Sequence, residues 1–280
     1  TYSEGLNIYD PVNETIVNYS YNPLDSNSIS SSRITCIAVD MANNIWVGTD
    51  NGLNLFINNK GFKRFYNDPR NVNSLSNNHI TSIITDEDGN LWIGTQGGGV
   101  NRLIMDKNKI IFRHYNTNSK YGKISNNYIL SLCADNNDNI WIGTDNGGLN
   151  RFNPGTGTTD VYQTEEGIEF SIKSNSIWSL YADNENRLWI GTYNRGINVI
   201  DENFRKFELF QRINFSDNSL TNNDVKGFAE DNQGNVWIAT NGGGICKFNP
   251  ATRQFTRFIL NKNNQILISN NAVQDILYDS

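Results

Sequence analysis

Short apolar stretches alternate with short polar stretches along this chain, and none has the apolar spacing of an amphipathic helix. Residues 80–115 show the pattern most plainly. Four stretches there are apolar and rich in β-branched residues, as strands are: ITSIITD (80–86), LWIGT (91–95), VNRLIM (100–105) and IIFRHY (110–115). The polar stretches EDGN (87–90) and QGGG (96–99) have the composition of tight turns. The segment therefore predicts four antiparallel strands, followed by a longer polar connector at 116–127.

The same pattern recurs along the chain at a nearly constant period. Its clearest marker is a tryptophan in the second predicted strand, at Trp46, Trp92, Trp141, Trp189 and Trp237, with spacings of 46, 49, 48 and 48 residues. A period of this length with four strands per unit is typical of β-propeller blades. The predicted fold is an all-β β-propeller of four-stranded antiparallel blades, with five complete blades and partial blades at both ends.

The repeat also predicts the domain organisation, which is a single propeller domain over residues 1–280. Complete blades are expected at 34–67, 80–115, 128–163, 176–210 and 224–260. Residues 1–21 resemble the outer strands of a preceding blade, and residues 271–280 resemble the first strand of the next one. We therefore expect the chain to be a fragment of a longer propeller.

The glycine cluster that follows each tryptophan could be mistaken for a phosphate-binding loop. Such a loop occurs once, between a strand and a helix, whereas this cluster recurs in register and no helical pattern follows it. We interpret it as a hairpin turn in which glycine accepts positive φ. The tryptophans are expected to pack between blades as buried wedges. An aspartate six residues before each of them is expected to belong to a turn: Asp40, Asp86, Asp135, Asp183 and Asp231.

Composition excludes several classes of function. The formal charge is −6, the sequence pI is about 5.0 and no Lys/Arg cluster exists, so nucleic acid is not an expected partner. No apolar run is long enough to span a bilayer. The three cysteines are expected to be small buried residues, because no metal-ligand spacing accompanies them. We predict neither a metal nor a cofactor.

The string DGNLWIGTQGGGVNRL (88–103) and its relatives resemble the two-component regulator propeller repeat, as do the connectors SLSNNHI (74–80) and ISNNYIL (124–130). The resemblance covers about five repeats and nearly the whole chain. These repeats are found in extracytoplasmic sensor regions of bacterial signalling proteins, such as hybrid two-component sensors. The resemblance implies a periplasmic or extracellular sensor of a membrane-anchored receptor, with sugar polymers or their breakdown products as ligands. The implied partners are the remaining blades and downstream domains of the parent receptor, and a homodimer through that protein.

Two other classes of function stay open. A structural or protein-docking propeller would use the broad faces of the fold. A polysaccharide lyase or glycosidase would need paired carboxylates, and TEEGIEF (164–170) is the one acidic stretch inside a connector. The two histidines, His79 and His114, are not accompanied by a nucleophile elbow. We therefore expect a non-catalytic protein.

Candidate ligand-binding positions follow from aligning the repeats with one another. Positions that stay constant serve the scaffold, whereas positions that vary are free for function. The turn after the second strand and the connector to the next blade lie on the same face, and the residues flanking the first-strand Ile or Val vary there. We predict one axial pocket for an acidic oligosaccharide, because aromatic faces stack on sugars and polar groups pair with hydroxyls. It would be lined by Arg33, His79, Tyr128, Trp178, Tyr193, Arg195, Asp224 and Lys226.

Overall fold

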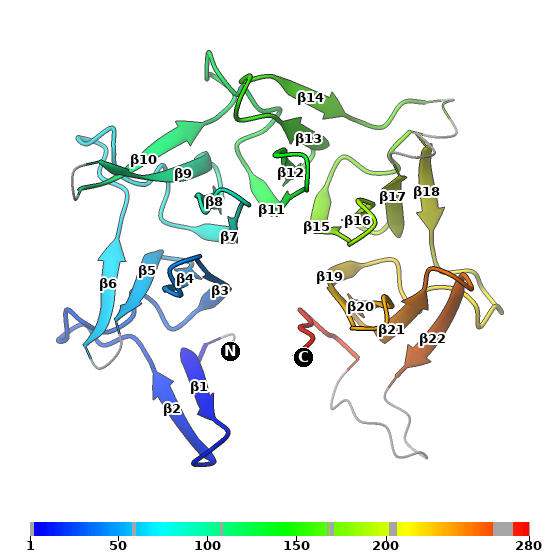
Figure 1. Cartoon of the computed structure of the whole chain (residues 1–280), viewed down its shortest axis with the longest axis horizontal. Helices are drawn as coiled ribbons and strands as arrows, with labels where there is room; N and C mark the ends of the chain where they lie inside the picture. Colours follow the sequence, from blue (N-terminus) through cyan, green and yellow to red (C-terminus); the bar gives the residue numbers. More distant parts are fainter. Residues whose placement is uncertain are drawn as a thin grey trace. The chain divides into compact units, whose positions relative to one another are not determined.

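The computed structural model describes residues 3–57, 60–106, 109–166, 168, 171–201, 206–259 and 271–279. These residues form strands joined by turns and connectors (Figure 1), and among them no helix is long and apolar enough to cross a membrane. The chain divides into two compact units. Unit 1 comprises residues 1–134, 138–140 and 152–159, and unit 2 comprises residues 135–137, 141–151 and 160–280.

The described strands belong to one two-stranded and five four-stranded antiparallel sheets. The two-stranded sheet is β1 (Leu6–Asp10) and β2 (Thr15–Tyr19). The next two sheets are β3 (Ile34–Val39), β4 (Ile45–Thr49), β5 (Gly52–Ile57) and β6 (Gly61–Phe65), then β7 (Ile80–Thr85), β8 (Leu91–Thr95), β9 (Gly99–Asp106) and β10 (Lys109–Tyr115). The third is β11 (Ile129–Ala134), β12 (Ile140–Thr144), β13 (Leu149–Phe152) and β14 (Thr159–Tyr162). The last two are β15 (Ile177–Ala182), β16 (Leu188–Thr192), β17 (Ile197–Asp201) and β18 (Lys206–Phe210), then β19 (Val225–Glu230), β20 (Val236–Thr240), β21 (Gly244–Asn249) and β22 (Gln254–Phe258).

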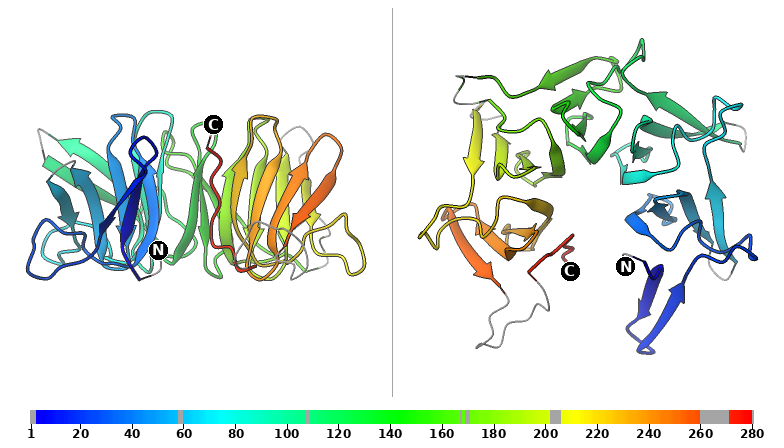
Figure 2. Two further views of the ribbon diagram at one scale, coloured as in Figure 1. Left: turned by 90° about the horizontal axis from the view of Figure 1, so that it is seen from below. Right: turned by 180° about the vertical axis from the view of Figure 1, so that it is seen from behind.

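Each four-stranded sheet is a meander in which consecutive strands pair, and this confirms the predicted propeller blades. Within unit 1 the first strands β3, β7 and β11 are neighbours, and within unit 2 β15 is a neighbour of β19. Residues 271–279 run beside β19 (Figure 2), and Asp275 contacts Gly227. In this segment Ala272 makes one isolated bridge to Asn241, and residues 273–279 form no strand, because no described second strand pairs with them.

The repeated tryptophans have two structural roles. Each indole Nε1 donates a hydrogen bond to the aspartate six residues earlier, at 2.7–2.9 Å, so this aspartate holds the tryptophan as well as the turn. Trp92 and Trp189 also pack on an aromatic ring of the following blade. Trp92 lies 5.9 Å from Phe152 and Trp189 lies 5.4 Å from Phe248, measured between ring centroids.

The expected burial of the five tryptophans holds for four of them. Trp46, Trp92, Trp141 and Trp189 are buried, but Trp237 is half-buried. The reason is that no four-stranded sheet follows β22 among the described residues, so the outer side of Trp237 lacks this cover. The expectation for the cysteines also needs correction, since Cys246 is buried but Cys36 and Cys133 are half-buried.

Packing requires a small residue two positions after each repeated tryptophan, in the second strand of the sheet. In four repeats this residue is the glycine of the sequence WIGT or WVGT, and in three of them the structure records its cross-strand partner as Cys36, Ser82 or Ser179. A Cβ on Gly94 would lie 2.7 Å from Ile129 of the next blade. The fifth repeat has Ala239 instead, and its cross-strand partner is Gly227. The space for the alanine methyl group is therefore provided by a glycine on the neighbouring strand.

Candidate functional site

One edge of every sheet carries the turn between its second and third strands and the connector that enters the next sheet. We call this edge the glycine-turn face. In four connectors, the asparagine two residues before the first strand of the next sheet holds this edge in place. Asn223, for example, accepts the Gly196 N–H on its backbone oxygen at 3.2 Å and the Arg212 N–H on Oδ1 at 2.6 Å. The same two bonds recur in the other blades at Asn78, Asn127 and Asn175.

The first strands contain a β-bulge at the glycine-turn face. The pairing register shifts between residues 34 and 36, 80 and 82, 177 and 179, and 225 and 227. A bulged residue has no partner in the ladder, so its side chain can be directed away from the sheet. The residues inside these four shifts are Thr35, Thr81, Trp178 and Lys226. In these four blades the fold therefore provides one such side chain at this edge, and it is threonine in two of them.

Four of the predicted residues contact one another in unit 2, and we call Trp178, Tyr193, Asp224 and Lys226 the inner cluster. The Trp178 and Tyr193 rings are stacked, with centroids 5.5 Å apart and an interplanar angle of 21°. Lys226 Nζ lies 2.9 Å from the Trp178 ring centroid and 3.2 Å from Asp224 Oδ1. The side chain of Lys226 is only 8% exposed, whereas Tyr193 is 54% exposed. Tyr193 is therefore the accessible aromatic surface of this cluster.

Charge within the inner cluster is balanced locally. Asn241 Nδ2 donates to Asp224 Oδ2 at 2.9 Å, while Lys226 pairs with Oδ1 of the same carboxylate. Burial lowers the pKa of Lys226, and the Asp224 carboxylate opposes part of that change. Lys226 thus faces an indole and a carboxylate inside the protein and is not displayed to solvent.

Three other predicted residues lie in unit 1. Arg33 Nη1 is 3.9 Å from Asp50 Oδ2. His79 interacts electrostatically with both of these charged groups. Burial lowers the pKa of His79, Asp50 opposes this change and Arg33 adds to it. Tyr128 is 51% exposed and bridges to Gln96 through its backbone. Whether the residues of both units line one pocket stays a prediction.

Sequence reasoning missed two members of these groups, Asp50 and Asn241. Both directly follow the threonine that ends the second strand, a position represented among the predicted residues by Tyr193. In the structure this residue bonds through its backbone N–H to the residue before the first strand, as Tyr193 does to Ser176 and Asn241 to Asp224. Comparing that one aligned position in all five repeats would have found them. Arg195, the eighth predicted residue, is exposed on the turn after β16.

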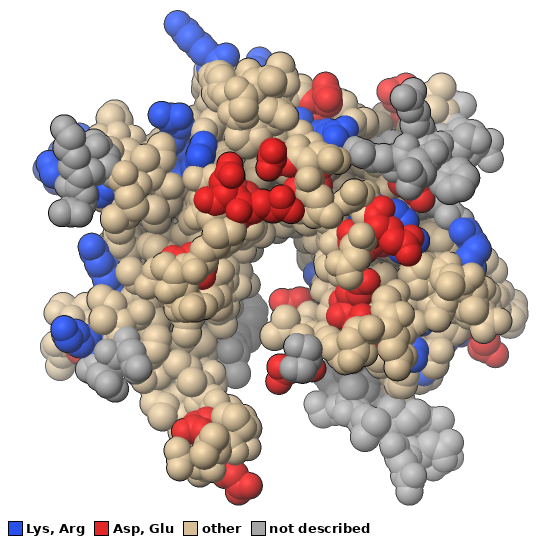
Figure 3. Space-filling model, viewed as in Figure 1, with Lys and Arg blue, Asp and Glu red and all other residues tan. Residues whose placement is uncertain are grey.

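The opposite edge of the sheets carries acidic side chains. In unit 1, Glu87, Asp88 and Asp138 lie exposed on the turns between first and second strands. Figure 3 shows acidic side chains gathered over β7, β8 and β11. An acidic ligand would be repelled there, so its expected place is the glycine-turn face.

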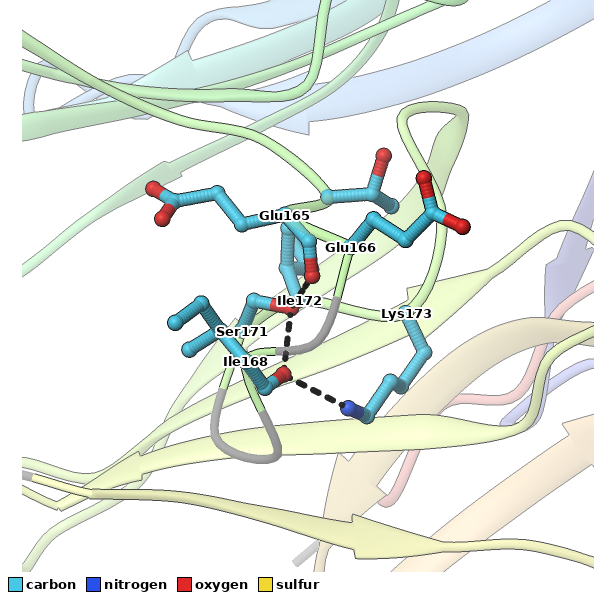
Figure 4. Close-up of a pocket in the computed structure, with 7 residues that line it drawn as sticks. Glu165, Glu166, Ile168, Ser171, Ile172 and Lys173 are labelled. Atoms are coloured by element: carbon cyan, nitrogen blue, oxygen red, sulfur yellow. Dashed lines mark hydrogen bonds between the residues drawn. The ribbon is translucent and has the colours of Figure 1, made fainter.

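The connector between β14 and β15 forms a hollow of about 470 Å³ around Ser171 and Ile172. Ser171 Oγ donates to the backbone oxygens of Glu165 and Ile168, at 3.2 and 3.0 Å. Figure 4 shows the Glu165 and Glu166 carboxylates pointing away from one another. Residues 167, 169 and 170 of the acidic stretch lie outside the described residues. Glu165 and Glu166 therefore do not form the facing carboxylate pair that a glycosidase uses.

The described residues contain no group of three or more His, Cys, Asp or Glu side chains that could hold a metal ion. His114 Nε2 is 2.6 Å from the Ser74 backbone oxygen, so this ring nitrogen carries a proton and donates. Arg64 and Arg257 contact the same connector position in their own blades, through the oxygens of Ser28 and Ser219. His114, in the fourth strand β10, therefore binds the connector that leads into its own blade.

Replacing Lys226 by methionine is expected to change how stability depends on pH. A folded-state pKa below the unfolded value means that the unfolded chain binds more protons, so stability rises with pH between those two values. The wild type should therefore gain unfolding free energy relative to Lys226→Met as the pH rises toward the ordinary lysine pKa of about 10.4. Urea unfolding of both proteins at several pH values measures this difference.

Lys247→Met is the matched control, because Lys247 also lies near an indole, 5.5 Å from the Trp237 ring centroid. The comparison subtracts the alkaline titration of groups common to all three proteins. A constant difference between wild type and Lys226→Met over this range would contradict the burial of a charged ammonium at this position.

Comparisons with known proteins agree with this architecture. The model of the two component regulator propeller family matches residues 28–51, 74–97, 123–146, 171–194 and 219–242. Each match covers a connector and the first two strands of a blade, together with the turn that follows them. No curated protein sequence matches the chain significantly.

Several solved structures share the fold. The extracellular domain assigned to the hybrid two component system BT4673 of B. thetaiotaomicron is 22% identical, with a TM-score of 0.55, over 99% of this chain and 42% of that one. PorZ, a surface component of the type-IX secretion system of Porphyromonas gingivalis, is 18% identical, with a TM-score of 0.63, over 89% of this chain and 36% of that one. Virginiamycin B lyase of Staphylococcus aureus is 17% identical, with a TM-score of 0.59, over 82% and 71%.

At these identities the likeness shows the fold alone, and the chain spans less than half the length of the first two structures. The family matches fall on all five four-stranded sheets, at the tryptophan strands, glycine turns and connectors whose contacts recur from blade to blade. The chain therefore contains five repeats of the two-component regulator propeller family.

Proposed function

We propose that this chain is the non-catalytic, ligand-sensing propeller of a bacterial signalling receptor and that it binds an oligosaccharide at the inner cluster. The observation that carries the proposal is the stacked Trp178–Tyr193 pair beside the Lys226–Asp224 ion pair, on the variable edge of the repeat. An aromatic face suits the C–H face of a sugar, and the exposed Arg195 on the same turn can donate to its hydroxyls.

The contacts refine which group would meet the sugar. Lys226 already contacts the Trp178 ring, so the exposed Tyr193 offers the larger stacking surface. Two of the three basic residues in the predicted pocket are near aspartates, Arg33 near Asp50 and Lys226 near Asp224. The exposed Arg195, two residues after Tyr193, is therefore the group we assign to an acidic substituent of the ligand.

The cellular setting is part of the proposal. Repeats of this family and the likeness to the extracellular domain of BT4673 support a periplasmic or extracellular position in a membrane-anchored receptor. The parent protein would then supply further blades and an output module as partners. Ligand binding would be transmitted through those parts, and a homodimer of the parent protein is the expected assembly.

Calorimetry against a panel of neutral and acidic glycans tests the proposal. Tyr193→Ala and Trp178→Ala should weaken binding of any glycan by about tenfold, since aromatic contacts dominate sugar recognition. Arg195→Ala should weaken acidic glycans selectively. Tyr9→Ala and Arg70→Ala are matched controls, because Tyr9 is 59% exposed and the Arg70 side chain is 93% exposed, both in unit 1.

The same assay separates the alternative functions. Unaltered binding in Tyr193→Ala, Trp178→Ala and Arg195→Ala would place the ligand elsewhere. Shortening of a glycan during the incubation would favour a lyase or glycosidase. Failure of every glycan to bind, together with capture of a purified receptor domain, would favour protein docking.

A further inference from the structure

A second hollow lies on the glycine-turn face of unit 2, next to the inner cluster. Its volume is about 350 Å³, within the range of small-ligand sites. Its walls are the connector between β18 and β19, the turn between β20 and β21, and the end of β22. Its lining includes Arg212, Phe215, Thr221, Gly242 and Arg257. We call it the outer hollow.

The connector wall of the outer hollow is held in place by Arg257. Its Nε donates to Ser219 O at 3.0 Å, its Nη2 donates to Ser219 Oγ at 2.9 Å and to Ser216 O, and its Nη1 pairs with Asp217 at 3.2 Å. Arg64 makes equivalent bonds to the connector of its own blade. Arg257 therefore belongs to the scaffold, and its donors are already engaged.

Arg212 differs from Arg257 in this respect. Its backbone N–H is fixed by Asn223 Oδ1, and its side chain is exposed without an ion pair to any residue the structure describes. The residues that make the same backbone bond in the other connectors are uncharged: Tyr21, Asn67, Thr117 and Thr164. A cation at this position is thus specific to one blade, and the scaffold does not require it.

Phe215 stands at the apex of the same connector with its side chain fully exposed. Its φ is 64°, an unfavourable backbone conformation for a bulky side chain. The equivalent apices, Leu24 and Arg70, are also exposed, so the fold presents this position to solvent in other connectors as well. A strained, exposed aromatic ring beside a hollow is a reason to look for a ligand there.

Asn222 and Asn241 form a ridge that separates the outer hollow from the inner cluster. Asn241 bonds to Asp224 through its backbone N–H at 2.9 Å and through its side chain at 2.9 Å. Asn222 Nδ2 donates to Asn241 O at 2.8 Å. Gly242 and Thr221, the chain neighbours of these two asparagines, line the hollow. A single residue pair therefore separates the two sites.

We propose that the outer hollow is a second subsite for the same ligand, so that the protein recognises a linear oligosaccharide chain and not a single sugar. One sugar would lie on Tyr193 in the inner cluster, and the chain would cross the Asn222–Asn241 ridge. A later sugar would stack on Phe215, with Arg212 bonding its hydroxyl or carboxylate groups. This inference rests on the proposed function, of which it specifies the ligand class.

Chain length is the variable that tests it. The probes are linear oligomers of galacturonic acid and of galactose, from disaccharide to octasaccharide, measured by calorimetry on the intact chain. Wild-type affinity should rise with length in at least one series. Phe215→Ala should reduce the affinity for the longer oligomers by about tenfold and leave the disaccharide unchanged. Arg212→Gln should reduce it by roughly fivefold, more for the acidic series.

Leu24→Ala is the matched control, since it removes an exposed apolar side chain from the equivalent apex in unit 1. Tyr193→Ala should weaken every length, which distinguishes the two subsites. If affinity is already maximal for the disaccharide, or if Phe215→Ala and Arg212→Gln bind all lengths like the wild type, the second subsite does not exist and the inner cluster stands alone. If no oligomer binds the wild type, the proposed function is wrong for these polymers and this inference is overturned with it.

Discussion

Replacement of Trp141 by alanine is expected to lower the free energy of unfolding by roughly 3–5 kcal/mol. The Trp141 side chain is buried, its Nε1 donates to Asp135 Oδ2 at 2.7 Å, and its ring stacks on Tyr162 at a centroid distance of 5.9 Å. Arg151 lies 5.3 Å from the ring. The substitution therefore creates a cavity and leaves a partly buried carboxylate without one of its donors. Urea unfolding followed by circular dichroism measures the loss.

Trp178→Ala provides the comparison within the same unit. Trp178 is half-buried in a β-bulge, outside the repeated tryptophan position. Its loss should cost roughly 1–2 kcal/mol, through the contacts with Tyr193 and Lys226. Equal costs for the two substitutions would contradict the view that the repeated tryptophan is a main support of the blade.

The strands were predictable because the signals that define them are local. Residues 80–115 were expected to form strands at 80–86, 91–95, 100–105 and 110–115, and the structure has β7–β10 at 80–85, 91–95, 99–106 and 109–115. Alternating apolar stretches and turn residues determine such boundaries without knowledge of the rest of the chain. The period then identified the architecture, because each unit can bury its faces only against its neighbours.

Contacts between strands and between blades were less accessible to sequence reasoning. The aspartate six residues before each tryptophan was visible as a pattern and was assigned to a turn, but its bond to the indole depends on how the two strands pair. The asparagine of each connector was visible in the same way, and its bonds to the preceding blade depend on how the blades stack. Both features become interpretable only when register is known.

The candidate site was predicted in part for a related reason. Aligning the repeats selected Trp178, Tyr193, Asp224 and Lys226, and these four residues are in contact. The alignment identifies residues at equivalent places on adjacent blades, but it does not give the direction of a flexible side chain. Lys226 was expected to face a ligand, whereas its ammonium group faces the Trp178 ring.

Gly191→Ala is the second substitution with a large expected effect, roughly 3 kcal/mol of lost unfolding free energy, at the upper end for overpacking. A Cβ at position 191 would overlap Ser179 Oγ on the neighbouring strand and would lie 3.0 Å from Val225 Cγ1 of the next blade. Both neighbours are nearly inaccessible to solvent, and Ser179 is the direct cross-strand partner of Gly191. The structure therefore leaves little room for relaxation around a new methyl group.

The fifth blade shows how the same position can hold alanine. There Ala239 pairs with Gly227, so the small residue has moved to the first strand. Transferring this arrangement to the fourth blade, as Ser179→Gly with Gly191→Ala, should recover more than half of the stability lost in Gly191→Ala. Ser179→Gly alone should cost about 1 kcal/mol or less, because the greater chain entropy of glycine is offset by removal of a buried hydroxyl that has no hydrogen-bond partner among the described residues.

Urea unfolding of the wild type, both single variants and the double variant gives the coupling energy between the two positions. A favourable coupling of about 1–3 kcal/mol would establish that the glycine of the repeat serves cross-strand packing. Without coupling, Val225 and not Ser179 would be the obstacle, and the glycine would be required by the contact between blades. The exchange of glycine and alanine between strands would then need another explanation in the fifth blade, where Gly227 lies against Asp275.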